Sequence, residues 1–300
     1  MTASEIAAAL GGFRGSGGWC RARCPVHASR GATLALRDGE RGLIAVCHAG
    51  CSRADLLDEL RRRGMLPGAI DHRPAPIPLR TDARDETARR IDLVRRIWDA
   101  ARDARGTPAK AYLLGRGITM DPPASLRWAP ALRRPDGMFG PAMLARIDDV
   151  NGTLIGLSRT WLIRDDKGIW RRRDRAMLGL AAGGAVRLGP IRSDEWLVIG
   201  EGVETVMAVM TATTMPGWAA LSTSGLRVLM LPPIVHKVLI LVDHDANGAG
   251  ERAARTAAQR WLAEGREVRL AMPPEPDTDF NDVLLGRGHA RIEEVRDVAA

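Results

Sequence analysis

The chain has 300 residues, of which 45% are apolar, so we expect two or three compact units with real cores, and global disorder is excluded. Lys and Arg number 44 against 36 Asp and Glu, a formal net charge of +8. A basic chain favours a polyanionic partner, although a GC-rich genome that favours Arg codons would explain part of the excess. No stretch approaches 18 uncharged apolar residues and the first ten show no signal-peptide pattern, so we expect a cytoplasmic protein without a membrane partner.

All four cysteines lie near the start of the chain. Cys24-Pro-Val-His27 is followed, after an insert of 19 residues, by Cys47-His-Ala-Gly-Cys51. Two close pairs separated by a hairpin-length insert are typical of a structural zinc site, and the insert predicts a strand at 33–36, a turn at 38–39 and a strand at 43–46. A disulfide is disfavoured in a cytosolic protein. We therefore expect a structural Zn²⁺ bound by four residues: Cys24, His27, Cys47 and Cys51.

Two further side chains in this segment, Cys20 and His48, are surplus to such a site, and either could enter it in another register. The segment resembles the zinc ribbon at the front of bacterial-type primases, with Cys-Pro-x-His and a later Cys pair. Its second pair has a three-residue gap, a form common in primase-like proteins of mobile elements. The resemblance implies that the module at 1–66, which ends in a helix capped by Ser52, helps to engage a single-stranded template. Residues 67–80 hold four prolines and predict a semi-extended linker.

The middle of the chain, 81–192, predicts a basic α+β subdomain. Residues 81–105 form an expected charged helix with an apolar stripe, and 110–118 resemble the helix upstream of the catalytic domain in bacterial-type primases. A β-meander is expected over 141–161, where Asn151-Gly-Thr fits a hairpin turn better than a glycosylation acceptor.

Basic residues gather in the second half of this subdomain. Gly156-Leu-Ser-Arg159 stands where the primase family places a Gly-rich strand that ends in Arg, and residues 167–175 combine five arginines and lysines with Trp170. Basic residues interleaved with an aromatic suit a groove for single-stranded nucleic acid. We expect Arg159, Arg175 and Trp170 to contact nucleic acid or nucleotide; the alternative is a solvated run of charge.

Three acidic clusters organise the last hundred residues. Glu201 follows the apolar run 196–199, and Asp243 with Asp245 follows the run 238–242. Such runs without alternation predict buried parallel strands, and the helical spacing between them predicts a doubly wound α/β sheet with the acids at its carboxyl edge. Asp279 and Asp282 come after 267–272, whose alternation predicts an outer strand. Clustered carboxylates repel one another, so we expect Mg²⁺ or Mn²⁺ among them.

The three motifs, Glu-Gly-x-Glu, Asp-x-Asp-x-x-Gly and Asp-x-Asn-Asp, resemble the Toprim domain of primases, type IA and II topoisomerases and some nucleases. The resemblance implies a Rossmann-like, mostly parallel sheet at 193–300, so that the chain would be α/β at its C-terminus, after the α+β basic subdomain and the zinc ribbon. That order is typical of bacterial-type primases, especially the short ones of phages, plasmids and integrated elements.

The resemblance implies a nucleotidyltransferase that makes short RNA primers on single-stranded DNA from nucleoside triphosphates. Glu201, Asp243 and Asp245 would hold two divalent ions, and Asp279 with Asp282 would support the second. The family's helicase would be a separate chain, because no phosphate-binding Gly-x-x-x-x-Gly-Lys-Ser/Thr motif occurs.

Two positions depart from the replicative primases. Thr205 stands where they place a further acid, and Thr278 stands where they place Lys; the neighbouring Glu204 is expected to face elsewhere on its helix. Two alternatives therefore stay open: a Toprim nuclease whose ions activate water, and an inactive accessory protein that binds single-stranded DNA. A topoisomerase needs a tyrosine that attacks the DNA strand, in a large additional domain. The only tyrosine here, Tyr112, lies in the expected upstream helix, so this class is excluded.

Overall fold

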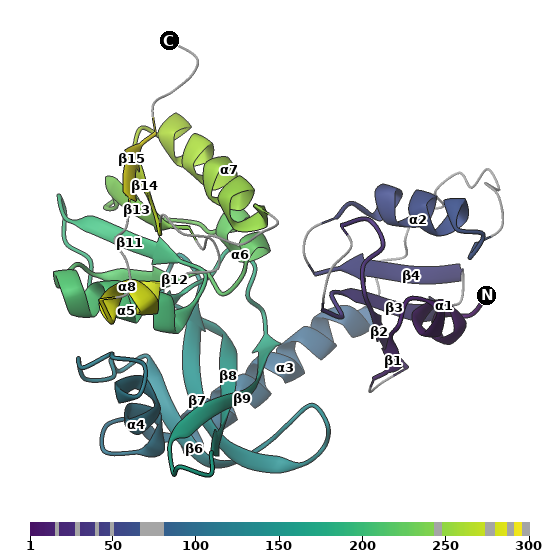
Figure 1. Cartoon of the computed structure of the whole chain (residues 1–300), viewed down its shortest axis with the longest axis horizontal. Helices are drawn as coiled ribbons and strands as arrows, with labels where there is room; N and C mark the ends of the chain where they lie inside the picture. The colour runs from purple at the N-terminus through teal and green to yellow at the C-terminus, as the bar shows by residue number, and fades with distance from the viewer. Residues whose placement is uncertain are drawn as a thin grey trace. The chain divides into compact units, whose positions relative to one another are not determined.

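The computed structural model describes residues 1–15, 18–27, 31–39, 42–48, 51–66, 81–242, 248–273, 280–286 and 291–295. The chain divides into two compact units, Met1–Leu79 and Arg80–Ala300 (Figure 1). The expected linker at 67–80 lies outside the described residues. Nowhere in the described ranges is there a helix long and apolar enough to cross a membrane.

The first unit is built on an antiparallel sheet whose four strands follow chain order: β1 (Phe13–Arg14), β2 (Cys20–Ala22), β3 (Leu34–Gly39) and β4 (Gly42–Cys47). Helix α1 (Ala3–Ala9) precedes the sheet and α2 (Arg53–Arg62) follows it. Ser52 caps α2 as predicted, because its hydroxyl accepts a hydrogen bond from the Asp55 amide at 3.1 Å. The predicted hairpin is confirmed, but the turn comes later than expected, since pairing continues to Gly39 and Gly42.

The second unit begins with α3 (Thr81–Ala100), which is five residues shorter than the predicted helix. The chain leaves the helix there to form β5 (Arg102–Asp103), which pairs with β6 at the edge of a second antiparallel sheet. Helix α4 (Pro108–Leu114) comes next, and the remaining strands are β6 (Leu126–Arg133), β7 (Phe139–Asp148), β8 (Leu154–Arg164) and β9 (Trp170–Gly179). The predicted meander is thus confirmed and is longer than expected.

The two faces of this sheet bury different cores. Val94 and Trp98 of α3 pack on one face together with Trp161. The opposite face carries Met143 and Leu162, which join a core shared with α4 and with the C-terminal sheet. Alternation along each strand therefore decides which side chains can reach the C-terminal domain.

The C-terminal sheet has six strands in the order β10-β12-β11-β13-β14-β15, and the four central strands are parallel. Its elements are β10 (Val186–Arg187), β11 (Trp196–Gly200), α5 (Val203–Thr213), β12 (Gly217–Ala219), α6 (Thr223–Val228), β13 (Lys237–Leu241), α7 (Ala249–Ala263), β14 (Glu267–Met272), α8 (Phe280–Leu284) and β15 (Arg291–Glu294). Helices α5 and α8 contact one another on one face, and α6 with α7 cover the other. The α/β architecture predicted for this part is confirmed, and burial on both faces explains the apolar runs of β11 and β13.

Strand β14 is not an outer strand, so that prediction was wrong. β15 pairs antiparallel along its free side, with Leu270 opposite Glu293 and Ala271 opposite Ile292. The polar residues that alternate in β14 are held by this neighbour: the Arg269 guanidinium forms an ion pair with Glu294 at 3.1 Å. The alternation came from pairing with a short polar strand at the sheet's edge.

Candidate functional site

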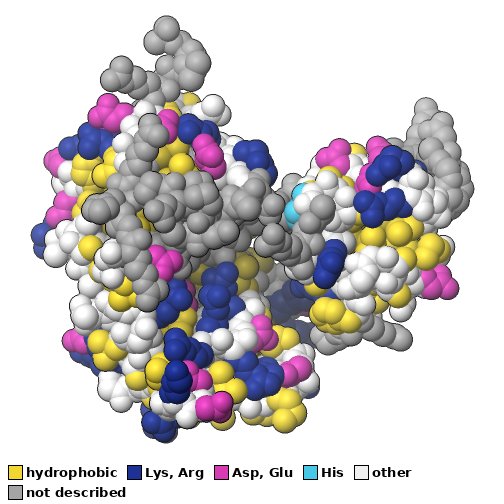
Figure 2. Space-filling model, in the orientation of Figure 1, with side chains coloured by type: hydrophobic (Ala, Val, Ile, Leu, Met, Phe, Trp, Pro, Cys, Tyr) yellow, Lys and Arg dark blue, Asp and Glu magenta, His cyan; other side chains and the backbone are white. Residues whose placement is uncertain are grey.

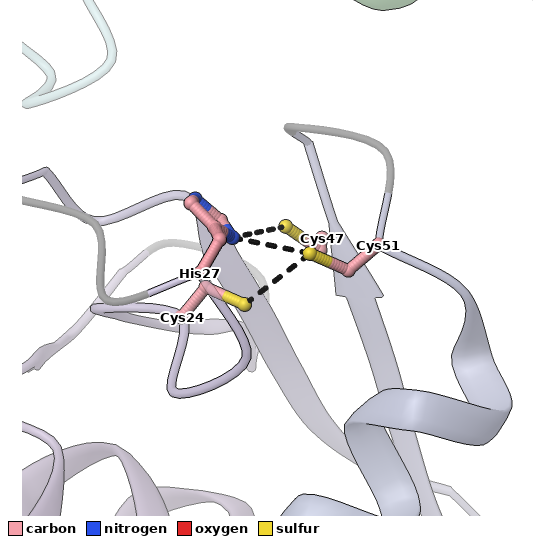
Figure 3. A group of neighbouring side chains, drawn as sticks. All are labelled: Cys24, His27, Cys47 and Cys51. Atoms are coloured by element: carbon pink, nitrogen blue, oxygen red, sulfur yellow. Dashed lines mark hydrogen bonds between the residues drawn. The ribbon is translucent and has the colours of Figure 1, made fainter. Parts of the chain in front are cut away.

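Four side chains of the first unit converge between the 24–27 turn and the end of β4 (Figure 3). Their ligand atoms all lie within 4.8 Å of one another: those of Cys24, His27, Cys47 and Cys51. His27 Nδ1 lies 3.1 Å from Cys51 Sγ and 3.8 Å from Cys47 Sγ, and the Cys24 and Cys51 sulfurs are 3.9 Å apart. Around a tetrahedral Zn²⁺ with bonds of about 2.0–2.3 Å, donor atoms stand roughly 3.6–3.8 Å apart. The cluster therefore has the size of a structural zinc site.

The surroundings also suit a cation. Burial, followed by the nearby Cys24 sulfur, raises the pKa of the Cys51 thiol to about 12, so thiolates here need a positive charge among them. Thr33 Oγ1 lies 3.4 Å from His27 Nε2, which leaves Nδ1 as the nitrogen that faces the sulfurs. Cys20 and His48 lie outside the cluster: Cys20 is buried in the core of the unit, and His48 is exposed.

The second candidate site lies at the carboxyl edge of the C-terminal sheet. Glu201 directly follows β11, which pairs in parallel with β13 so that Ile199 faces Ile240. The ends of both strands therefore meet at one edge, as expected for a doubly wound sheet. Asp243, Asp245 and Asp279 lie outside the described residues, and Asp282 is half-buried on α8 beside α5.

A polar pocket of about 250 Å³ opens beside Glu201. Its described lining consists of Arg116, Arg172, Arg175, Glu201, Gly202, Glu204 and Thr205. Glu204 lies in the first turn of α5 and Glu201 lies between β11 and that helix, whereas the arginines come from β9 and from the turn after α4. The pocket thus joins the C-terminal domain to the basic subdomain and brings the predicted Arg175 beside the predicted Glu201.

The turn after α4 is locked against α8. Asn281 is buried, and with its amide oriented to match, it accepts from the Arg116 guanidinium at 2.5 Å and donates to the Arg116 carbonyl at 3.2 Å. Gly117 has a φ of +77°, and a Cβ there would stand 3.0 Å from Leu285. Arg116 and Gly117 therefore allow this turn to approach α8, which carries Asp282 of the third acidic motif, closely.

Carboxylate Glu204 meets the basic subdomain directly. The Tyr112 hydroxyl of α4 donates a 2.9 Å hydrogen bond to Glu204 Oε1, and both side chains are buried. Burial first, and then the neighbouring carboxylate, raise the pKa of Tyr112, so the phenol stays protonated and remains a donor. Glu204 was expected to face elsewhere on the helix than position 205, whereas both residues line the same pocket.

Arg159 does not reach this pocket. It lies on the strand face that bears Trp161, where its guanidinium stacks 5.0 Å from the ring and donates to the Met177 carbonyl at 3.1 Å. Gly156, three residues earlier, is required by packing, since a Cβ there would collide with the Leu180 carbonyl. Part of the family-like Gly-Leu-Ser-Arg segment is thus explained by sheet structure.

Trp170 is half-buried and makes an edge-to-face contact with Trp128, with ring centroids 6.3 Å apart. One side of the ring is therefore used inside the protein, and a role in base stacking stays a prediction.

The sequence did not predict four of the residues found at or beside the pocket: Arg116, Arg172, Tyr112 and Glu204. Arg116 and Tyr112 do belong to the segment at 110–118 that resembles the primase helix, which was the available signal.

Comparison with known families finds two matches. Residues 196–290 match the Toprim domain, and residues 88–188 match a domain of unknown function (DUF7146). A comparison with curated proteins found no match.

Among solved structures, the chain is similar to the Aquifex aeolicus primase (zinc binding and RNA polymerase domains), at 15% identity and a TM-score of 0.40, over 97% of this chain and 84% of that one. A DNA primase domain from Pseudomonas aeruginosa is 18% identical over 67% of this chain and 75% of that one, with a TM-score of 0.42. The primase fragment of the bacteriophage T7 primase-helicase is 20% identical, over 63% and 69%, with a TM-score of 0.39.

The Toprim match covers the sheet that carries the candidate acids, and the Cys₃His cluster precedes it in the chain. This chain therefore carries a Toprim domain in its second unit and a Cys₃His cluster of zinc-site size in its first.

Proposed function

We propose that this protein is a DNA primase-like nucleotidyltransferase that joins ribonucleotides on a single-stranded DNA template. The observation that carries the proposal is the pocket in which Glu201 of the Toprim domain meets three arginines from the preceding subdomain. Carboxylates that bind a divalent ion and arginines that bind phosphate oxygens are together what a nucleoside triphosphate requires.

The arginines suit the triphosphate. Within the part of the chain that the structure describes, Arg172 and Arg175 are exposed and form no ion pair with a carboxylate. Their guanidinium groups are therefore available for bidentate contacts with phosphate. Arg116 is already oriented by Asn281, so it reaches the pocket at little further cost in side-chain entropy.

The acids suit divalent ions. Glu201 would hold Mg²⁺ or Mn²⁺ together with Asp243 and Asp245, and Asp279 with Asp282 would support a second ion or its waters. Such ions lower the pKa of an attacking 3′-hydroxyl and neutralise charge on the triphosphate. Oxygen-rich ligands at one sheet edge fit these hard cations.

A single strand could run along the face of the sheet that bears Arg175. Arg175 pairs with Thr160 and Thr160 with Met143, so alternation puts Phe139 on the same face of the sheet. Phe139 is 67% exposed at the end of the β6–β7 hairpin. Figure 2 shows Lys and Arg side chains gathered over the region of this sheet. Exposed aromatic and basic side chains suit stacking and phosphate contacts with an unpaired strand.

In this proposal the Cys₃His cluster holds a structural Zn²⁺ that folds the first unit and allows it to engage template. A separate replicative helicase would supply unwound DNA, and the setting would be replication of a phage or another mobile element. The order of zinc module and Toprim domain supports both points.

The test is primer synthesis on a mixed-sequence single-stranded template with labelled nucleoside triphosphates and Mg²⁺ or Mn²⁺. We expect short products from the parent chain and none from Asp243→Asn/Asp245→Asn, whereas the matched surface variant Asp149→Asn keeps parent activity. Loss of template without nucleotides would instead indicate a nuclease. Absence of product even with an added helicase, while single-stranded DNA is still bound, would indicate an accessory protein.

A further inference from the structure

Glu204 is a buried carboxylate that the predicted site does not use. Its exposure is only 5%, yet it lines the polar pocket beside Glu201 and Thr205. It lies in the first turn of α5, just after Gly202 at the helix N-cap. The side chain is therefore removed from bulk water while one side of its environment remains the open pocket.

The described contacts of Glu204 do not balance its charge. Across the described ranges, it accepts one hydrogen bond, from the Tyr112 hydroxyl at 2.9 Å, and forms no ion pair. Tyr112 is itself only 4% exposed and is neutral. Removing a carboxylate from water is costly, and one neutral donor offsets only part of that cost. A cation bound at this carboxylate would offset more of it.

The composition of the pocket indicates which cation. Arg116, Arg172 and Arg175 line it without lying within ion-pair distance of Glu204, and they suit phosphate. Thr205, on the same turn of α5, lacks a carboxylate. Glu204 is thus the second described carboxylate in the pocket that holds Glu201, and carboxylates that line one pocket favour a hard divalent ion.

We propose that Glu204 is a further ligand of the divalent cation held at Glu201, and that Tyr112 is the positioning residue that fixes its carboxylate. The inference rests on the proposed function only in placing a divalent cation at Glu201. Tyr112 holds Oε1, and Oε2 is left for the cation or for one of its waters. The carboxylate at 204 takes over the role of the acid that is missing at 205.

The contact also joins the two parts of the second unit. Tyr112 lies on α4 of the basic subdomain, 92 residues before Glu204 on α5 of the Toprim domain. The cation proposed at Glu204 therefore depends on one residue from each part: the ligand comes from α5, and the side chain that positions it comes from α4.

The experiment measures Mn²⁺ binding to the zinc-loaded full chain, without nucleotides, by electron paramagnetic resonance and calorimetry. We expect Glu204→Gln to weaken Mn²⁺ binding on the order of 100-fold, and Tyr112→Phe, which removes only the donor, by about tenfold. Glu195→Gln, the same change at the opposite end of β11, leaves the affinity unchanged.

Thermal unfolding of the metal-free chain separates ligation from misfolding. Glu204→Gln removes a buried charge at constant shape, so we expect it to melt at or above the parent temperature. Parent-like Mn²⁺ affinity in Glu204→Gln would overturn the assignment, and parent-like affinity in Tyr112→Phe would overturn the positioning role. If the parent makes no primers while its Mn²⁺ affinity still depends on Glu204, the proposed function fails and this inference stands.

Discussion

Two regions of this molecule gather ionisable side chains into a candidate site, and they do so in different ways. The Cys₃His cluster takes its four ligands from 28 consecutive residues of one small unit. The Toprim pocket combines Arg116, Arg175 and Glu204, which come from a turn, a strand and a helix of two subdomains. The first region is local in sequence, and the second exists only after α4, β9 and α5 have packed together.

The difference predicts what each site does for stability. In the first unit the core is small, so cation binding and folding are expected to be one equilibrium. In the second unit, three fully buried tryptophans and two sheet faces already provide a core: Trp161, Trp218 and Trp261. There we expect the charged groups of the pocket to cost stability rather than to supply it.

Removal of zinc is expected to have the largest effect. Chelation, or Cys51→Ala, should unfold the first unit and leave the second folded, because metal ligation supplies on the order of 10 kcal/mol of folding free energy in such modules. Amide hydrogen exchange of the full chain measures this, with loss of protection in the helices and strands of the first unit and none in the second.

Cys20→Ala is the matched control, since this cysteine is buried but lies outside the cluster. It should keep one zinc per chain. A parent chain with less than one zinc, or a chelated first unit that keeps its protection, would contradict the contrast between the regions.

Arginines on the two faces of the β-meander are expected to differ in their effect on nucleotide binding. Arg175→Ala should weaken nucleoside triphosphate binding by roughly 10- to 100-fold, the value of a charge-assisted hydrogen bond of about 1.5–3 kcal/mol. Arg159→Ala should leave binding unchanged and lower the melting temperature, because its guanidinium stacks on Trp161. Nucleotide calorimetry on both variants checks this, and equal losses of affinity would show that the face assignment is wrong.

A smaller effect is expected at the hairpin end. Phe139→Ala should weaken single-stranded DNA binding by about 1 kcal/mol, the lower end of base stacking on an aromatic ring. Its high exposure means that the melting temperature should not change. Phe139→Tyr keeps a stacking surface and serves as the control in fluorescence anisotropy; a parent-like affinity for Phe139→Ala would restrict the template to the arginines.

The contrast between local and long-range sites also explains which features could be predicted from the sequence. Ligand spacing, the Ser52 cap and the unbroken apolar runs before Glu201 and Asp243 depend on near neighbours, and each predicted its local structure or the parallel sheet correctly. The orientation of Glu204 depends on where α4 packs, and the position of β14 depends on a strand beyond it. Neither relation has a local signal.

The arginines show the same limit. Arg159 and Arg175 look alike in sequence, and the register of β8 and β9 puts them on opposite faces. Composition predicts that a basic surface exists, and only the pairing register decides which of its members reach the acids.

The smallest expected effect tests a purely local charge pair, Asp103 with Arg105. Hydrogen bonds from the Arg105 side chain and amide lower the pKa of Asp103 to about 2. Because the folded pKa lies below the usual value, the contribution is present at neutral pH and is lost as the pH falls through 4 towards 2. Exchange of the Arg105 amide should therefore be slower in the parent than in Asp103→Asn at pH 7, with a difference that shrinks towards pH 2 and vanishes below it. Both side chains are exposed, so water screens the pair and the difference should be slight. A difference that persists below pH 2 would mean that backbone geometry, and not the Asp103–Arg105 charge pair, holds this turn. The turn would then differ from the two candidate metal sites, whose charges are expected to matter.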